Sequence, residues 1–247
     1  MRIAILSTPR SGNSWVRQVL ADLYDLAEIL VHDPTEIPAE LPLRVILQLH
    51  WYREPGLQRW LREHGFRVLV IARHPLDVLL SVLHFVRHEP ETARWLAGNA
   101  ELPPGLGLAS PTSPLFAEYA LSWGAENLLG ISTAWWQDRD ALRTRYEALL
   151  RDPRQAFGSL IASLGATHNP LDAALERARL EVWQATWNHH GWRGQSGLWR
   201  SLLPPRTAWR IYRRHARVFR VLGYTVAPYM LTVRYAEQRW RELAINR

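Results

Sequence analysis

A loop near the start of the chain has the residue types of an anion-binding site. It runs STPRSGNSW from Ser7 to Trp15. Arg10 supplies a positive charge, and Gly12 lets the backbone approach a ligand closely because it has no side chain. The further donors are the polar side chains of Ser11, Asn13 and Ser14. Together these residues predict a site for a phosphate or a similar anion.

The position of this loop in the chain supports the same prediction. An apolar run at 2–7 predicts a buried parallel strand, and apolar spacing at 13–24 predicts a helix. The free N–H groups at a helix start and the helix dipole favour an anion there. The Walker A pattern GxxxxGK[ST] is absent from the loop. From the local pattern alone, an ordinary strand-to-helix turn with a surface arginine is the alternative.

Two further strand ends carry candidate functional residues. A strand predicted at 44–50 ends in His50, and an imidazole titrates near neutral pH, as a general base should. A strand predicted at 67–72 is followed by Arg73, with Ser81 about two helical turns later. A partly buried histidine with a satisfied hydrogen bond is the alternative for His50.

Strands and helices alternate along the chain. This order predicts an α/β fold with a doubly wound parallel sheet, in one domain over 1–247 with a core at 1–224 and a helical extension at 225–247. A helix predicted at 75–87 has Asp77 in its first turn, where we interpret it as favourable to the helix dipole. The other expected elements are helices at 115–137, 153–165, 206–221 and 229–245 and a strand at 141–146.

A long segment without clear periodicity lies at 88–114. Its length and its Pro, Gly and Ser content predict a lid or a mobile loop. Loops at 30–40 and 51–60 are expected to join it in forming a pocket for a second ligand, because binding residues lie disproportionately on loops. A further loop is expected at 188–200.

The last predicted helix, 229–245, has apolar residues at helical spacing. Such a stripe predicts one face packed on the domain, with a membrane-surface role as the alternative. The residues of the stripe are Tyr229, Val233, Ala236 and Trp240.

The composition limits the classes of protein. The sequence has 30 arginines and no lysine, and its formal net charge is +7. It also has no cysteine. The lack of Cys excludes disulfides, thiolate catalysis and Cys-ligated metals. A basic surface attracts phosphates, nucleic acid or anionic membranes. The start of the sequence has no signal-peptide layout and no apolar run nears membrane-spanning length, so a cytoplasmic protein is expected.

The loop from Ser7 to Trp15 resembles the 5'-phosphosulfate-binding loop of sulfotransferases that use 3'-phosphoadenosine-5'-phosphosulfate (PAPS). Many members have Tyr-Pro-Lys-Ser-Gly-Thr-Thr-Trp there, and several bacterial and carbohydrate-modifying members resemble the Pro-Arg-Ser-Gly variant seen here. The resemblance implies that Arg10, in place of the lysine, steadies the bridging oxygen as the S–O bond breaks. It also implies that Trp15 stacks on adenine and that the phosphosulfate is bound by Ser11, Gly12, Asn13 and Ser14.

Other segments resemble further motifs of this family. RHPLDVLLS, beginning at residue 73, is similar to the motif whose Arg and Ser grip the 3'-phosphate. RYE at 145–147 resembles the Tyr-Glu-Asp-Leu segment that contacts adenine, and WRGQSGLWR at 192–200 resembles a loop that closes over the 3'-phosphate. The residues that these matches assign to PAPS are Arg73, Ser81, Tyr146, Arg193, Gly194 and, as a second adenine-stacking element, Trp187.

The resemblance implies an enzyme, a PAPS-dependent sulfotransferase. Such an enzyme transfers a sulfuryl group to a hydroxyl or amine of a small or medium acceptor by in-line attack, releases 3'-phosphoadenosine-5'-phosphate (PAP) and needs no metal. The family's Lys-Thr-His stretch matches 48–50, which implies that His50 is the base and that Gln48 replaces a lysine. The sequence leaves open which acceptor is used and whether the protein forms a homodimer.

Two other functions remain alternatives. A P-loop-type kinase or NTPase would use Arg10 on ATP, although the Walker lysine is absent. A nucleic-acid or membrane-surface binder would use the basic C-terminal helices, although no nucleic-acid-binding motif is visible. The expected partner is therefore a small-molecule acceptor and not nucleic acid.

Overall fold

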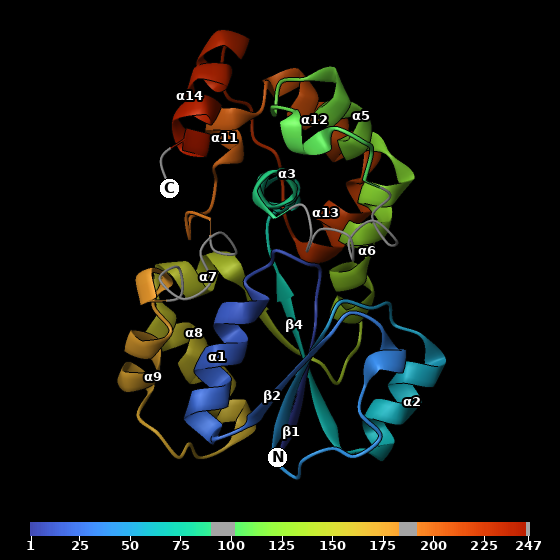
Figure 1. The fold of residues 1–247 in the computed structure, drawn as a ribbon, viewed down its shortest axis with the longest axis vertical. Helices are drawn as coiled ribbons and strands as arrows, with labels where there is room; N and C mark the ends of the chain where they lie inside the picture. Colours follow the sequence, from blue (N-terminus) through green and yellow to red (C-terminus); the bar gives the residue numbers. More distant parts are fainter. Residues whose placement is uncertain (90–101, 183–191, 246–247) are drawn as a thin grey trace. The chain divides into compact units, whose positions relative to one another are not determined.

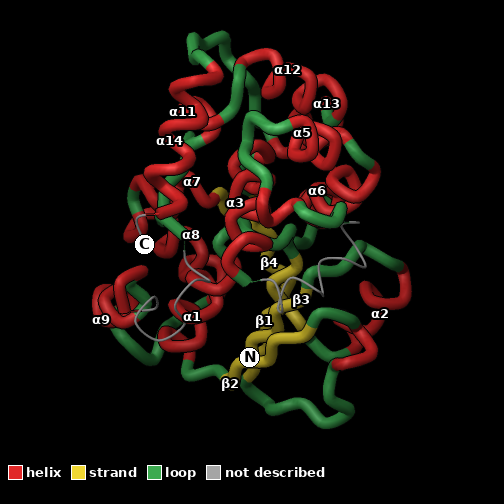
Figure 2. The backbone as a smooth tube through the Cα atoms, turned by 45° about the horizontal axis from the view of Figure 1, so that its top comes forward, coloured by secondary structure: helices red, strands yellow, loops and turns green. Residues whose placement is uncertain are grey.

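The strands form one parallel sheet. The computed structural model describes residues 1–89, 102–182 and 192–245. The strand order is β2-β3-β1-β4-β5, and each neighbouring pair is parallel. Figure 2 shows strands of this sheet in yellow. This confirms the predicted α/β class with a parallel sheet. The strands are β1 (Arg2–Leu6), β2 (Ala27–Val31), β3 (Val45–Leu49), β4 (Phe66–Ala72) and β5 (Leu142–Arg145).

The register of the sheet brings the loop after β1 and the residue His50 after β3 to the same end of the sheet. β1 and β3 are neighbours, and their last residues, Leu6 and Leu49, lie opposite each other. The anion-site loop and His50 therefore begin side by side at the carboxyl ends of these strands, where parallel sheets bind ligands.

The chain folds into two compact units. Unit 1 comprises Met1–Arg73 and Ile131–Thr186, and unit 2 comprises His74–Gly130 and Trp187–Arg247. The prediction of one domain with a core at 1–224 stays a prediction.

Unit 1 holds the sheet with helices on both of its faces (Figure 1). Apolar side chains of α1 (Asn13–Tyr24), α8 (Pro153–Leu164) and α9 (Leu171–Arg177) form a core with one face of the sheet. On the other face the core includes side chains of α2 (Pro55–Glu63) and of the second half of α6 (Trp123–Trp136). The short helix α7 (Tyr146–Arg151) follows β5 directly.

Unit 2 is helical. The side chains of α3 (Pro75–His88) are buried from Pro75 to Phe85, as expected of a helix that is apolar on most sides. Figure 1 shows the other helices of this unit around it. They are the first half of α6, the 3₁₀ helix η2 (Leu106–Leu108) and the helices α5 (Pro114–Leu121), α11 (Trp199–Leu202), α12 (Pro205–Arg214), α13 (Ala216–Leu222) and α14 (Val233–Ile245).

The expected strand at 2–7, helix at 13–24 and helix at 153–165 are confirmed within one residue at each end. Among the elements that were not expected are the strand β2 and the helices α2, α7, α9 and α11. β2 is an edge strand that is exposed at Ala27, Glu28 and Leu30, so it lacks the continuous apolar run that marks a buried parallel strand. Consequently the segments proposed as pocket loops at 30–40 and 51–60 contain part of β2, the 3₁₀ helix η1 (Pro34–Glu36) and most of α2.

Two expected helices are each divided in the structure. The helix expected at 115–137 is wrong as one element, because Ser122 has an extended backbone and its hydroxyl accepts from the N–H of Ala125 at 3.2 Å, as an N-cap does. The helix expected at 206–221 breaks at His215, whose ring bonds the carbonyl of Ala120 at 2.8 Å.

The C-terminal helix begins later than expected. α14 starts at Val233, and Tyr229 lies before it, with its hydroxyl donating to the carbonyl of Leu203 at 2.6 Å. Ala236 and Trp240 are buried as the stripe predicts, but Val233 is 56% exposed because it occupies the first turn. The packed face is therefore shorter than the sequence pattern indicates.

Part of the expected lid at 88–114 lies outside the described residues, as does Trp187. The described part of that segment contains the end of α3 and the 3₁₀ helix η2. Among the described helices, none has the length and apolar character needed to cross a membrane.

Candidate anion site and the surroundings of His50

The backbone of the loop after β1 is shaped as a cradle. Arg10 and Gly12 both have left-handed conformations, with φ values of 65° and 94°. Successive N–H groups in such a loop point toward a common centre and make an anion-binding concavity. Gly12 is also the N-cap of α1. Because glycine offers no side chain as a cap, the first N–H groups of that helix are left for a ligand.

Tyr146 and Arg73 line this loop from two other strand ends of unit 1. A Cβ atom at Gly12 would lie 2.6 Å from Cδ2 of Tyr146, so the ring packs directly on the glycine. The guanidinium of Arg73 lies 4.5 Å from the centre of the same ring, and its Nη1 donates to the carbonyl of Arg10 at 2.8 Å. Four residues that the sequence assigned to PAPS, Arg10, Gly12, Arg73 and Tyr146, therefore form one packed group.

Ser11 provides the direct test of whether the loop fits an anion. Its hydroxyl is buried, with 1% of the residue exposed, and has no hydrogen-bond partner among the described residues. A buried hydroxyl without a partner is costly, and an anion in the cradle would remove that cost. Ser11 therefore fits the predicted role.

Asn13 helps to shape the loop, and its predicted contact with the donor stays a prediction. Its amide donates to the carbonyl of Thr8 at 2.9 Å and so closes the loop on itself. Thr8 is held in turn by α6, because its N–H donates to the hydroxyl of Ser132 at 2.7 Å and its hydroxyl accepts from the N–H of Ser132 at 3.1 Å. We therefore assign Asn13 to the shape of the cradle. The support from Ser132 was not foreseen, since no local pattern links residues that far apart in sequence.

Trp15 contacts the protein core. Its ring meets the edge of Phe157 at 5.8 Å between centroids, and the side chain is half-buried against the core on the α1 face of the sheet. The roles of Trp15 and Ser14 toward a nucleotide stay predictions.

His50 is held at the edge of the sheet by hydrogen bonds to both ring nitrogens. Nδ1 lies 2.7 Å from the carbonyl of Ser7, and Nε2 lies 3.3 Å from the amide nitrogen of Gln48. Burial lowers the pKa of His50 from its ordinary value to about 4, helped by the charges of His32, Arg17 and Arg10 and opposed by the bond to Ser7. His50 is therefore neutral at physiological pH, but it is a weaker base than the free imidazole assumed from the sequence.

In unit 2 the loop expected over the 3'-phosphate is fastened to α3 by Asp77. One carboxylate oxygen accepts from the N–H of Gly197 at 2.6 Å and the other from the N–H of Trp199 at 3.0 Å. This corrects our interpretation of Asp77 as a residue that only favours the helix dipole. Trp199 also stacks on His74, with 4.9 Å between ring centres.

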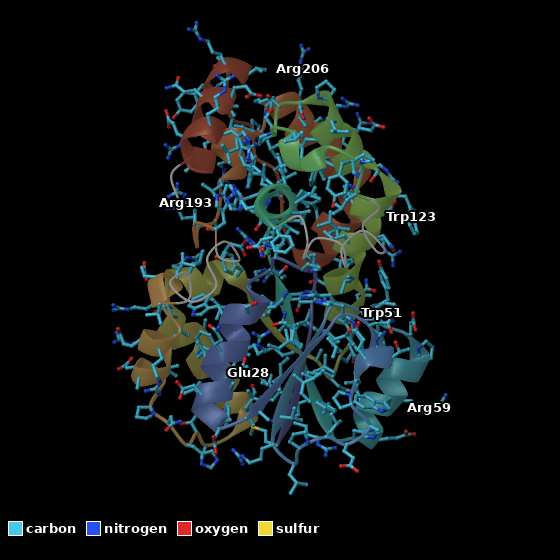
Figure 3. The ribbon with its side chains drawn as sticks, viewed as in Figure 1. Glu28, Trp51, Arg59, Trp123, Arg193 and Arg206 are labelled. Atoms are coloured by element: carbon cyan, nitrogen blue, oxygen red, sulfur yellow. The ribbon has the colours of Figure 1, made fainter. Side chains whose placement is uncertain are left out.

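The remaining predicted donor-binding residues also belong to unit 2. Ser81 is buried on α3. Gly194 has a left-handed backbone (φ 57°), and Arg193, labelled in Figure 3, is half-buried with its Nη2 3.5 Å from the carbonyl of Leu243. Their assignment to the 3'-phosphate stays a prediction.

Replacing Asp77 with asparagine should destabilise the fold. One acceptor oxygen would become an NH₂ group facing a backbone N–H, which leaves a buried donor unsatisfied and costs about 1–3 kcal/mol of unfolding free energy. Chemical denaturation would measure it. Asp172→Asn is the matched control, because Asp172 is 67% exposed in its ion pair with Arg154 and should change stability little. Equal stability of the two variants would contradict the anchoring role.

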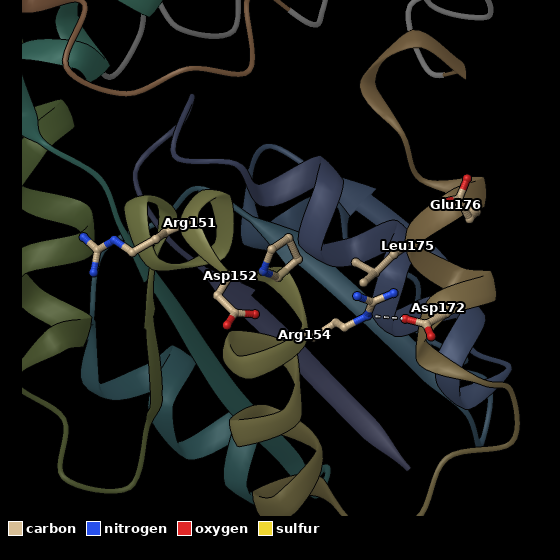
Figure 4. Close-up of a pocket in the computed structure, with 7 residues that line it drawn as sticks. Arg151, Asp152, Arg154, Asp172, Leu175 and Glu176 are labelled. Carbon is tan, nitrogen blue, oxygen red and sulfur yellow. Dashed lines mark hydrogen bonds and ion pairs between the residues drawn. The ribbon is translucent and has the colours of Figure 1, made fainter.

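A pocket of about 220 Å³ on unit 1 is a second candidate site (Figure 4). Within it, Nε of Arg154 pairs with Asp172 at 2.7 Å, and both side chains are well exposed. Exposed ion pairs of this kind contribute little to the stability of the fold. None of the predicted site residues lines this pocket, whose lining residues are Arg151, Asp152, Pro153, Arg154, Asp172, Leu175 and Glu176.

Comparison with known proteins identifies the fold. No protein-family model and no curated protein matches the sequence. Among solved structures, mouse sulfotransferase SULT7A1 complexed with PAP is similar over 89% of this chain and 84% of its own, with a TM-score of 0.64 and 18% identity. Retinol dehydratase in complex with androsterone and PAP matches over 92% and 82%, with a TM-score of 0.56 and 13% identity.

A third solved structure agrees with these two. The sulfotransferase domain from the curacin biosynthetic pathway matches over 91% of this chain and 98% of its own, with a TM-score of 0.52 and 15% identity. The chain therefore has the fold of these sulfotransferases.

Proposed function

We propose that this chain is a PAPS-dependent sulfotransferase that transfers a sulfuryl group to a hydroxyl or amine of a small acceptor. The observation that carries the proposal is the left-handed loop after β1, with the buried hydroxyl of Ser11 in it and Gly12 at the start of α1. PAP in two of the structurally similar proteins supports the same donor.

The residues of unit 1 fit the 5' end of PAPS. Backbone N–H groups of the loop and of the first turn of α1 would bind the phosphosulfate, with Ser11 as a further donor. Arg10 is half-buried in the same loop, where its charge would meet the bridging oxygen. Arg73 would approach the 3'-phosphate from the end of β4, in keeping with the resemblance.

The proposed reaction is one in-line displacement. The acceptor oxygen or nitrogen forms a bond to sulfur as the bond from sulfur to the 5'-phosphate oxygen breaks. The acceptor proton passes to Nε2 of His50, and the electron pair leaves with PAP. Arg10 stabilises the negative charge that develops on the departing phosphate.

Removal of Arg73 should weaken PAP binding at least about tenfold, because a charge-assisted contact is lost. Calorimetry with PAP, beside ATP–Mg²⁺, would measure this for wild type and Arg73→Ala. Arg154→Ala is the charge-matched control, since that side chain is 75% exposed. Unchanged PAP affinity would refute the placement of Arg73, and a preference for ATP–Mg²⁺ would favour the kinase alternative.

The acceptor is best sought with the whole protein. PAP release from PAPS in the presence of a library of phenols, alcohols, sugars and amines would identify the acceptor class. A different outcome would support a binding protein instead of an enzyme. In that case no member of the library would raise PAP release above the background with water, and the protein would bind duplex DNA or anionic vesicles tightly and in a salt-dependent way.

A further inference from the structure

Four polar side chains form a continuous chain of contacts that ends on His50. Oε2 of Glu28 on β2 accepts from Nε of Arg17 on α1 at 2.6 Å, and Nη1 of Arg17 donates to Oε1 of Gln48 on β3 at 2.8 Å. Nε2 of Gln48 then reaches Nε2 of His50 at 3.3 Å. Figure 3 labels Glu28 beside α1, at the outer end of this chain.

The guanidinium of Arg17 and the carbonyl of Ser7 fix which atom donates and which accepts in the hydrogen bonds of Gln48 and His50. A guanidinium only donates, so the oxygen of the Gln48 amide must face Arg17 and its NH₂ group must face His50. The carbonyl of Ser7 only accepts, so Nδ1 of His50 must carry a proton. Nε2 of His50 can then accept from the Gln48 NH₂ group only as an unprotonated nitrogen.

We propose that Glu28, Arg17 and Gln48 are positioning residues that act together with the Ser7 carbonyl to hold His50 neutral, with the proton on Nδ1 and Nε2 unprotonated. This inference rests on the proposed function, because it concerns the nitrogen that takes the acceptor proton. Arg17 orients the amide, and Glu28 holds Arg17 in place from the edge strand.

This series of contacts from Glu28 through Arg17 and Gln48 to His50, the relay, also opposes the charged form of the His50 ring. An imidazolium would turn an N–H group at Nε2 toward the NH₂ group of Gln48, and two donors cannot bond each other. Among the described residues, His32, Arg17 and Arg10 add electrostatically to the burial that lowers the pKa of His50. A proton taken from the acceptor is therefore held weakly and is readily released.

Arg17 also bears on residue 48, where the Lys-Thr-His motif that residues 48–50 resemble has a lysine. Gln48 is neutral, but it borders a guanidinium at 2.8 Å. The side chain of Arg17 is only 13% exposed, so its charge is poorly screened and polarises the Gln48 amide. A positive charge thus lies next to position 48 although the residue there has none.

The tautomer can be tested in the ligand-free protein by ¹⁵N NMR of the histidine ring, which requires no activity. Wild type should show a protonated Nδ1 and an unprotonated Nε2 at pH 7, and His50 should titrate below about pH 5. A His50 that is mostly the Nε2–H tautomer, or that titrates near its ordinary pKa, would overturn the proposal.

Gln48→Glu should raise the midpoint of the His50 titration by more than about one pH unit, because a carboxylate at that place accepts from a protonated Nε2. Gln155→Glu, at an exposed position of α8, adds the same charge elsewhere and should leave the midpoint unchanged. Gln48→Met keeps the size without a donor or a charge, so it covers the case in which the buried glutamate prevents folding. It should raise the midpoint, because the NH₂ group that opposes an N–H at Nε2 is gone, and a titration identical to wild type would refute the role of Gln48.

The outer members of the relay need separate variants. Arg17→Met should free the amide to rotate, so that its oxygen can accept from an N–H at Nε2 and the midpoint of the His50 titration rises, whereas Glu28→Gln keeps an acceptor for Arg17 and should retain the wild-type midpoint. A wild-type midpoint in Arg17→Met would limit the positioning role to Gln48 and overturn the proposed role of Arg17 and Glu28. Absence of any PAP release from PAPS would refute the proposed function while leaving these ring measurements valid, so the two failures are distinguishable.

Discussion

His50→Ala is expected to lower turnover by about 10²–10⁴-fold while the affinity for PAP changes by less than about twofold. The ring lies at the carboxyl end of β3, where its two nitrogens contact Ser7 and Gln48 of unit 1. Its proposed contact with substrates is to the acceptor proton alone, so donor binding should survive its loss. Single-turnover PAP release and calorimetry with PAP would measure the two quantities.

The pH profile gives this prediction a second measurement. Because the pKa of His50 is lowered to about 4, its Nε2 is unprotonated at all pH values well above 4. The acid limb of kcat/KM that belongs to His50 should therefore lie near pH 4 and not near 6.5, with activity falling as the pH is lowered through it. His168→Ala is a matched control in unit 1 and should keep full turnover. Turnover of His50→Ala within a few-fold of wild type would require a different base, with His84 the next candidate to examine.

Gly12→Ala is expected to weaken PAP binding by about 30- to 4,000-fold. A side chain at φ 94° costs about 1–2 kcal/mol. The added Cβ would also lie 2.6 Å from the ring of Tyr146, and overpacking of this kind costs about 1–3 kcal/mol. Each 1.4 kcal/mol lost from the binding-competent loop corresponds to about a factor of ten in affinity.

Gly158→Ala is the matched control, since a Cβ there meets nothing within 4 Å on α8. It should bind PAP like wild type and be as stable or slightly more so, because alanine favours a helix. The double variant Gly12→Ala, Tyr146→Ala separates the two causes, since it removes the clash but keeps the strained backbone. Wild-type PAP affinity in Gly12→Ala would show that the loop does not bind the donor.

The sequence by itself determined the parallel α/β fold and the location of the candidate site. Continuous apolar runs predict β1, β3 and β4, because a parallel strand is buried on both faces and needs no polar alternation. Once these strands are parallel neighbours of β1, the loop with Arg10 and Gly12 and the residues His50 and Arg73 must all lie at their carboxyl ends. That inference needs only local patterns and the geometry of a parallel sheet.

The tertiary structure alone decided which side chains support the site. Gln48 meets Arg17 and Glu28 only after β2 has joined the edge of the sheet and α1 has packed on its face. Asp77 meets the N–H groups of Gly197 and Trp199, and Tyr146 packs on Gly12, across more than a hundred residues of sequence in each case. Such contacts arise from packing and from the need to pair every buried polar group, and these are properties of the folded chain that no local sequence pattern records. The low basicity of His50 has the same origin, because it comes mainly from burial.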